Sequence, residues 1–233
     1  MPAASRPLVV RRPSPGRSFT PGTVQLGRAL LAAVAALMIT FSPDHSAAVG
    51  LSVFGGFTIV TSLVLILGAV VAQPSGRRWP FVLTGAISLV LGMAASVPAW
   101  RSDVLFFVLV ITWAALTGLV ELIAGIRSRG TDGARDAITV GALGLLLALL
   151  LLVIPVGFVQ QYAVEGQAFS LTGIILGVGM FGGYAAVVAV FLGIAGLAPA
   201  AEKHTGVPTP TEAEKHNETD AGADRLAERG GDA

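Results

Sequence analysis

The sequence contains no cysteine among its 233 residues, and charged residues are scarce, at 12% of the chain. The absence of cysteine excludes disulfides, thiolate metal sites and cysteine nucleophiles. A soluble domain usually carries about 25% charged residues, whereas this chain is 54% hydrophobic and has a mean hydropathy of +0.77. Composition alone therefore predicts an integral membrane protein.

Histidines are also few, and recognisable enzyme motifs are missing. The three histidines, His45, His204 and His216, are too dispersed to form a metal cluster. No GxSxG, HExxH, Walker A or Rossmann pattern occurs. Serines inside the apolar stretches are expected to bond to the backbone of their own helices; they are Ser52, Ser62, Ser88 and Ser96. We therefore expect neither an enzyme nor a protein that binds a metal, a cofactor or nucleic acid.

The few charges are concentrated at the two ends of the chain. Five arginines and no acidic residue lie in 1–28, and twelve charged residues lie in 202–233. Since a spanning helix needs about 20 mostly apolar residues, the charge-free stretches between these ends predict an all-α fold of six transmembrane helices. The expected helices lie near 24–42, 48–72, 80–97, 104–126, 138–156 and 169–197.

Two polar segments flank this six-helix membrane domain of 24–197. Residues 1–23 form a basic N-terminal segment, and residues 198–233 form a charged tail. The tail has few large apolar residues and is rich in charge, Pro and Gly, so we expect it to be disordered.

Lysines and arginines in the predicted loops indicate the orientation. With the N-terminus in the cytoplasm, fourteen of them lie on the inner side and only Arg101 lies on the outer side. This bias predicts that both termini are cytoplasmic, and the basic inner loops are expected to contact anionic lipids. The basic start followed by "ALLAAVAALMITF" also resembles a signal peptide, but the repeat described next favours its retention as the first helix.

The predicted helices form an internal repeat. The odd helices each begin with Gly, carry Leu four residues later and end at a Pro; they read "GRALLAAVAALMITFSP", "GAISLVLGMAASVP" and "GALGLLLALLLLVIP". The even helices share a looser pattern, in which "VTSLVLILGA" (60–69) aligns with "LTGLVELIAG" (116–125). The pattern predicts one two-helix hairpin used three times, with copies related by an axis along the membrane normal.

The stretch "FVLTGAISLVLGMAASVP…ITWAALTGLVELIAGIR…ITVGALGLLLALLLLVIP" resembles the HdeD-like family of small six-span bacterial membrane proteins. Its carrying features are the Gly-led odd helices that end in Pro, and Trp113 and Gly118 in a helix that runs into a basic loop. The resemblance covers roughly residues 24–197. It implies six spans, a plasma-membrane location and a link to acid-stress tolerance, and it brings no catalytic residues. The charged tail departs from the family pattern.

Glu121 is the one carboxylate inside a predicted span, and an ionisable residue there indicates a functional site. A helical wheel places it among small residues, including Gly118 and Gly125, while the opposite face holds Leu109, Leu116, Leu119, Ile123 and Ile126. We therefore expect Glu121 to face protein and to pair with Arg28. Arginines 77, 78, 127 and 129 are competing partners at the same depth.

The last predicted helix concentrates glycines. Gly173 and Gly177, and likewise Gly179 and Gly183, are four residues apart, a spacing that permits close helix approach. They predict packing within the bundle or against another copy in a homo-oligomer. The competing interpretation is a flexible, discontinuous helix that lines a pathway.

Three functions remain open from the sequence. The first is a non-enzymatic membrane bundle with an HdeD-like role in acid or envelope stress, in which Glu121 and Arg28 fix the helix packing. The second is a small proton- or solute-linked transporter or channel in which Glu121 titrates. The third is a membrane scaffold that presents the tail to a cytoplasmic partner.

Overall fold

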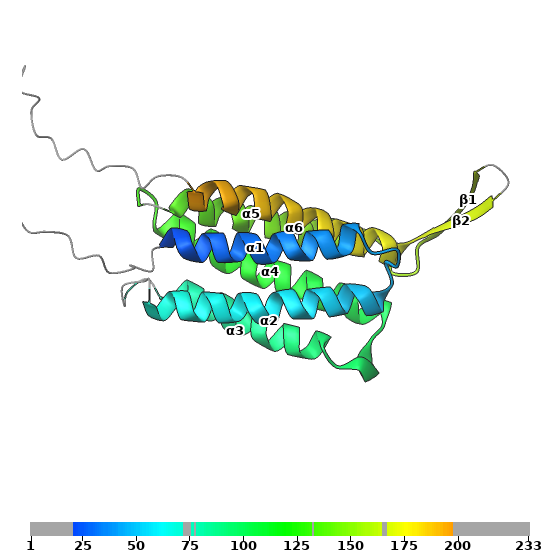
Figure 1. Cartoon of the computed structure of the whole chain (residues 1–233), viewed down its shortest axis with the longest axis horizontal. Helices are drawn as coiled ribbons and strands as arrows, with labels where there is room; N and C mark the ends of the chain where they lie inside the picture. The colour runs from blue at the N-terminus through cyan, green and yellow to red at the C-terminus, as the bar shows by residue number, and fades with distance from the viewer. Residues whose placement is uncertain (1–20, 72–75, 77, 132, 165–166, 198–233) are drawn as a thin grey trace, which may run out of the picture. The chain divides into compact units, whose positions relative to one another are not determined.

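The computed structural model describes residues 21–71, 76, 78–131, 133–164 and 167–197, and helices dominate this part of the chain (Figure 1). The α-helices are α1 (Pro21–Thr40), α2 (Ala47–Val71), α3 (Trp79–Ala95), α4 (Asp103–Arg127), α5 (Ala134–Val153) and α6 (Gly173–Leu197), with a short 3-10 turn, η2, at Pro98–Trp100. The predicted disordered tail and residues 1–20 of the basic segment lie outside the described residues.

The helices have the length and composition of membrane spans. Five of them, α1 from Gly22 onwards, α2, α4, α5 and α6, are long and apolar enough to cross a bilayer. The remaining apolar helix, α3, has 17 residues, which is at the short limit of what spans a hydrocarbon core of about 30 Å. The prediction of a mainly helical fold is thereby confirmed, and the five long apolar helices support the prediction of a multi-pass membrane protein.

Neighbouring helices alternate between extensive and limited contact. The most extensive packing joins α2 to α3, α4 to α5, and α6 back to α1, while contacts between α1 and α2, α3 and α4, and α5 and α6 are fewer. The two helices of each predicted hairpin are therefore not each other's closest partners. The closest pairs each join an even-numbered helix to an odd-numbered one from a different predicted hairpin.

Glycines explain why these pairs approach so closely. A Cβ atom on Gly141 of α5 would lie 2.6 Å from the Leu122 nitrogen and 2.7 Å from the Gly118 oxygen of α4. At the contact between α3 and α2, a Cβ on Gly85 would lie 3.3 Å from the Ser62 oxygen. Such backbone-to-backbone contact is how membrane helices associate through small residues.

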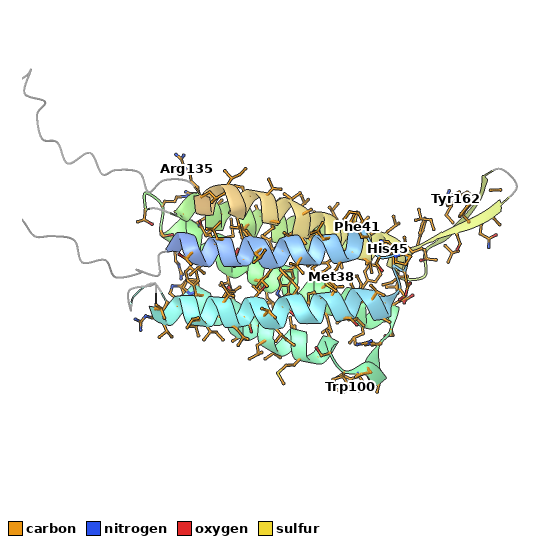
Figure 2. The ribbon with its side chains drawn as sticks, viewed as in Figure 1. Met38, Phe41, His45, Trp100, Arg135 and Tyr162 are labelled. Atoms are coloured by element: carbon orange, nitrogen blue, oxygen red, sulfur yellow. The ribbon has the colours of Figure 1, made fainter. Side chains whose placement is uncertain are left out.

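A two-stranded antiparallel sheet, which the sequence analysis did not predict, separates α5 from α6. It consists of β1 (Val159–Val164) and β2 (Gln167–Thr172), and Tyr162 pairs with Phe169 with their rings stacked at 5.8 Å. The hairpin extends beyond the ends of the helices (Figures 1 and 2). The last helix consequently begins at Gly173, where the backbone N–H donates to the Phe158 oxygen at 2.8 Å, and not near residue 169.

The two ends of the helix bundle differ in charge. We call the end at which α1 begins and α6 ends the basic end; it carries Arg78, Arg127, Arg129 and Arg135. The opposite end, from which β1 and β2 extend, is the hairpin end. Figure 2 shows Arg135 at one end and Phe41, His45 and Trp100 at the other.

Candidate functional site

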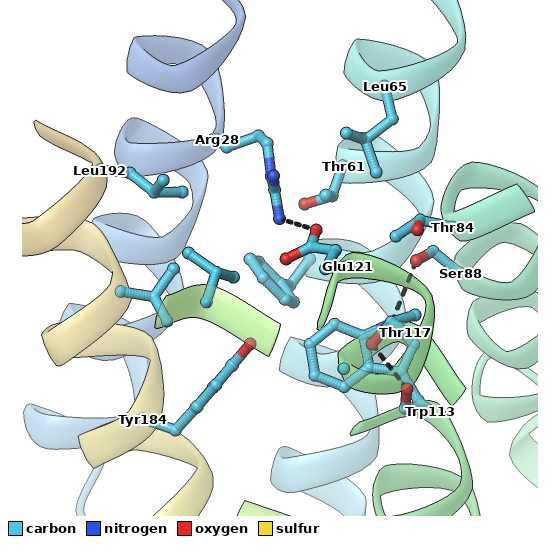
Figure 3. A pocket seen from close by; sticks show the side chains of 14 residues that line it. Arg28, Thr61, Leu65, Thr84, Ser88, Trp113, Thr117, Glu121, Tyr184 and Leu192 are labelled. Carbon is cyan, nitrogen blue, oxygen red and sulfur yellow. Dashed lines mark hydrogen bonds and ion pairs between the residues drawn. The ribbon is translucent and has the colours of Figure 1, made fainter. Parts of the chain in front are cut away.

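An ion pair joins the first helix to the fourth. The guanidinium Nη2 of Arg28, on α1, donates to Oε1 of Glu121, on α4, at 2.5 Å (Figure 3). The two side chains are only 18% and 11% exposed. The structure thus brings together the two residues that the sequence analysis proposed as partners.

Two of the arginines considered as alternative partners of Glu121 interact with other groups. The Arg127 guanidinium lies 6.0 Å from the centre of the Trp79 ring, and Nη2 of Arg78 donates to the Val70 oxygen at 3.3 Å. Both contacts are at the basic end. Arg77 is outside the described residues.

The local sequence of each helix explains why these charges meet inside the bundle. Glu121 shares the buried face of α4 with Thr117, Gly118 and Gly125, and small buried alanines follow Arg28 along α1, namely Ala29, Ala32, Ala35 and Ala36. Glu121 lies six residues before the end of α4, or about 9 Å at 1.5 Å per residue. Small neighbours leave room for two long charged side chains at this depth.

The opposite face of α4 is mostly exposed, as expected for a surface in contact with lipid. Leu116, Leu119 and Ile126 are 44%, 47% and 44% exposed. Leu109, which the helical wheel placed on this face, is instead buried at 6%. Leu109 belongs to the hydrophobic core together with Phe106, Phe107 and Val110, because the first turns of α4 are buried on more than one side.

A small cavity with both polar and apolar lining adjoins the ion pair, and all six helices contribute to its wall. Its volume is about 20 Å³, which is room for roughly one water molecule. The residues around it are Arg28, Phe57, Thr61, Leu65, Thr84, Ser88, Trp113, Thr117, Gly118, Glu121, Val140, Tyr184, Val188 and Leu192.

The even-numbered helices line the cavity with the same spacing. Each contributes three residues that are four positions apart: Phe57, Thr61 and Leu65; Trp113, Thr117 and Glu121; Tyr184, Val188 and Leu192. Residues four apart lie on one face of a helix, one turn above the other. The wall is therefore layered, from aromatic rings nearer the hairpin end to leucines and Glu121 nearer the basic end.

Aromatic packing closes the cavity towards the hairpin end. The Trp113 ring makes edge-to-face contacts with Phe57 at 5.8 Å and with Tyr184 at 6.0 Å. Phe54 and Phe181, both fully buried, pack behind this layer and contact Trp113 at 5.6 and 6.5 Å. These rings thus bound the cavity on the side of the hairpin end, and Glu121 lies two turns beyond Trp113 towards the basic end.

Hydrogen bonds satisfy only part of the polar wall. Thr117 Oγ1 donates to the Trp113 oxygen at 2.6 Å, and Trp113 Nε1 donates to Ser88 Oγ at 3.0 Å. Thr61 Oγ1 and Thr84 Oγ1, by contrast, have no hydrogen-bond partner within the described part of the chain, although each residue is only 5% exposed.

The serines inside the helices divide into two kinds. Ser52 and Ser62 donate to backbone oxygens of their own helix, α2, and Ser96, directly after α3, donates to the Gly92 oxygen of that helix, all at 2.6–2.8 Å, as expected from the sequence. Ser88 differs, because its hydroxyl accepts the indole N–H of Trp113 on a neighbouring helix.

The cavity and its threonines were not predicted from the sequence. Single threonines in an apolar helix carry no signal by themselves, since they often bond to their own backbone. A pattern shared by the even-numbered helices was available as a signal. In each of them an aromatic residue is followed four positions later by Thr or Val, and eight positions later by Leu or Glu.

The glycines predicted to mediate packing have two different environments. A Cβ would lie within 3.0 Å of a neighbouring atom at four of them: Gly118, Gly125, Gly173 and Gly177. At Gly179 and Gly183, a Cβ would meet nothing within 4 Å among the described residues. The helix that carries the last four of these glycines is continuous from Gly173 to Leu197, in contrast to the alternative of an interrupted last helix.

Chemically, the site offers one carboxylate, one guanidinium and several hydroxyls around a volume the size of a water molecule. The described residues contain no group of three or more His, Cys, Asp or Glu side chains able to hold a metal ion.

Compared with known proteins, the chain matches no protein-family model, no curated protein and no solved structure.

Proposed function

We propose that this chain is a non-enzymatic protein of the bacterial plasma membrane that contributes to tolerance of acid or envelope stress, as its resemblance to the HdeD-like family implies. In this proposal six helices span the bilayer as three hairpins with both termini in the cytoplasm, and the bundle acts by packing or associating in the membrane.

The observation that best supports this proposal is the buried ion pair between Arg28 and Glu121. Charges inside a membrane helix are costly unless they are paired, so their presence indicates a role. Here the pair links α1 to α4 in the interior of the bundle. A link of this kind fixes how two helices far apart in the sequence pack together.

A survival assay tests the stress role. A strain that lacks the protein is exposed to acid, and survival is compared after complementation with the wild-type chain or with Glu121→Gln. We expect lower survival without the protein, rescue by the wild-type chain, and weaker rescue by the variant at equal amounts in the membrane. Full survival of the strain that lacks the protein would contradict the proposal.

A second candidate is a small transporter or channel linked to protons or a solute, and the polar cavity beside Glu121 is the observation that favours it. Purified protein in liposomes would then conduct protons or solute across an imposed gradient, and Glu121→Gln would abolish the flux. An absence of flux for the wild-type chain would remove this candidate.

A third candidate, a scaffold for a cytoplasmic partner, depends on residues 198–233, which lie outside the described residues. Deletion of 199–233 tests it, because a scaffold would lose its function while the membrane domain would remain in place.

A further inference from the structure

We propose that the cavity beside the ion pair is a binding site for one water molecule, held by the hydroxyl groups of Thr61 and Thr84 and by the Glu121 carboxylate. This inference is independent of the proposed stress role, since it concerns how the interior of the bundle is hydrated.

The dimensions of the cavity fit a single water molecule. A site needs roughly 10–15 Å³ of accessible space and two to four polar partners to hold one. The cavity has a volume of about 20 Å³, and its polar lining groups include those of Thr61 from α2, Thr84 from α3 and Glu121 from α4 (Figure 3).

The two threonine hydroxyls require a partner that the described protein groups do not supply. A buried hydroxyl without a hydrogen bond is costly, because it has lost its bonds to bulk water and gained none. Each threonine hydroxyl can donate one hydrogen bond and accept others. A single water between them, with two protons and two lone pairs, satisfies both at once.

The charge balance of the cavity favours water over an ion. The positive charge of Arg28 and the negative charge of Glu121 compensate each other at 2.5 Å, so the wall holds no net charge that would retain a lone cation or anion. An apolar occupant would leave Thr61 and Thr84 unsatisfied. A neutral molecule of the size of water that both donates and accepts hydrogen bonds fits these conditions.

Substitution of each threonine by valine distinguishes a cavity that holds water from an empty one by the sign of the change in melting temperature. Valine keeps the shape of threonine and removes the hydroxyl. If water bridges the two residues, Thr61→Val and Thr84→Val each leave the water short of a partner and lower the melting temperature in detergent by about 2–4 °C. In the double variant the loss is smaller than the sum, because both hydroxyls hold the same water.

Thr58→Val is the matched control. Thr58 is fully buried on the same helix, but its hydroxyl donates to the Phe54 oxygen of its own helix at 2.8 Å and does not line the cavity. We expect its melting temperature to stay within about 1 °C of the wild type. A rise or no change in the melting temperature of Thr61→Val or Thr84→Val overturns the proposal, because removal of an unsatisfied hydroxyl from a dry cavity stabilises the fold.

Radiolytic labelling of the wild-type chain provides a second test that needs no variant. Hydroxyl radicals generated from a buried water oxidise the side chains beside it. Leu65 and Leu51 are both fully buried on α2, at 1% and 0% exposure, but only Leu65 lines the cavity. We expect several-fold more oxidation at Leu65 than at Leu51, measured by mass spectrometry. Equal oxidation of the two leucines overturns the proposal.

Discussion

At the scale of single residues, the buried charges of Arg28 and Glu121 dominate the energetics of the site. Removing one partner from a buried ion pair leaves the other charge uncompensated, which typically costs about 3–5 kcal/mol. Attraction between the two charges must in turn offset the loss of their hydration. The pair therefore favours the faces of α1 and α4 that meet, because separating these faces leaves both charges without this partner.

Also at the residue scale, substitution by alanine should change the stability of the protein differently at two glycines. A Cβ on Gly118 would lie 2.8 Å from the Gly141 oxygen and 3.0 Å from the Leu145 nitrogen, and backbone atoms cannot move aside without separating α4 from α5. Gly118→Ala should therefore lower stability by about 1–3 kcal/mol.

The matched control for this substitution is Gly179→Ala, since a Cβ there meets nothing within 4 Å among the described residues. It should be neutral or stabilise α6 by up to about 1 kcal/mol through its better helix propensity. Thermal unfolding in the same detergent compares the two variants. Equal losses of stability would contradict the proposed difference between the two glycines.

At the scale of secondary-structure elements, the helices were predictable because long apolar stretches have few alternatives in a membrane protein. The hairpin of β1 and β2 was not, because it lies within the same charge-free stretches as the helices before and after it. Its signal is the strand-forming composition of "VQQYAV" and "QAFSLT", with Val, Tyr, Phe and Thr spaced between polar residues. A search for uninterrupted apolar length does not detect that pattern.

The hairpin should be dispensable for the stability of the helices. Among the helices it has appreciable contact only with α6, through β2, and an isolated two-stranded hairpin is at best marginally stable. Replacing residues 159–172 by a short Gly/Ser linker should change the melting temperature in detergent by less than about 2 °C. A loss of about 5 °C or more would show that the hairpin supports the packing of α5 against α6.

At the scale of the whole molecule, composition and charge predicted a membrane protein but not its internal site. The pairing of Glu121 with Arg28 could be proposed because both are rare charges on small-residue faces. The cavity was missed, because the repeated spacing on each even-numbered helix shows which residues share a face but not that the faces carrying Thr61, Thr84 and Tyr184 meet. Which faces of those helices converge depends on the packing of the complete bundle.

The absence of cysteine makes the orientation of the molecule directly measurable. Gly76→Cys lies at the basic end, where a Cβ meets no atom of the described residues within 4 Å, and Ser170→Cys lies on the exposed hairpin. If the basic end is cytoplasmic, a membrane-impermeant maleimide should label Ser170→Cys in intact cells and Gly76→Cys only after permeabilisation. The reverse pattern would contradict the proposed orientation.

The measurement that tests the central claim most directly is a double-mutant cycle on the ion pair. Melting temperatures and free energies of unfolding are measured in detergent for the wild type, Glu121→Gln, Arg28→Gln and the double variant. The pair predicts that each single variant loses about 3–5 kcal/mol and that the double variant loses less than the sum by about 1–3 kcal/mol. Strictly additive losses would contradict the claim that Arg28 and Glu121 stabilise the bundle through each other.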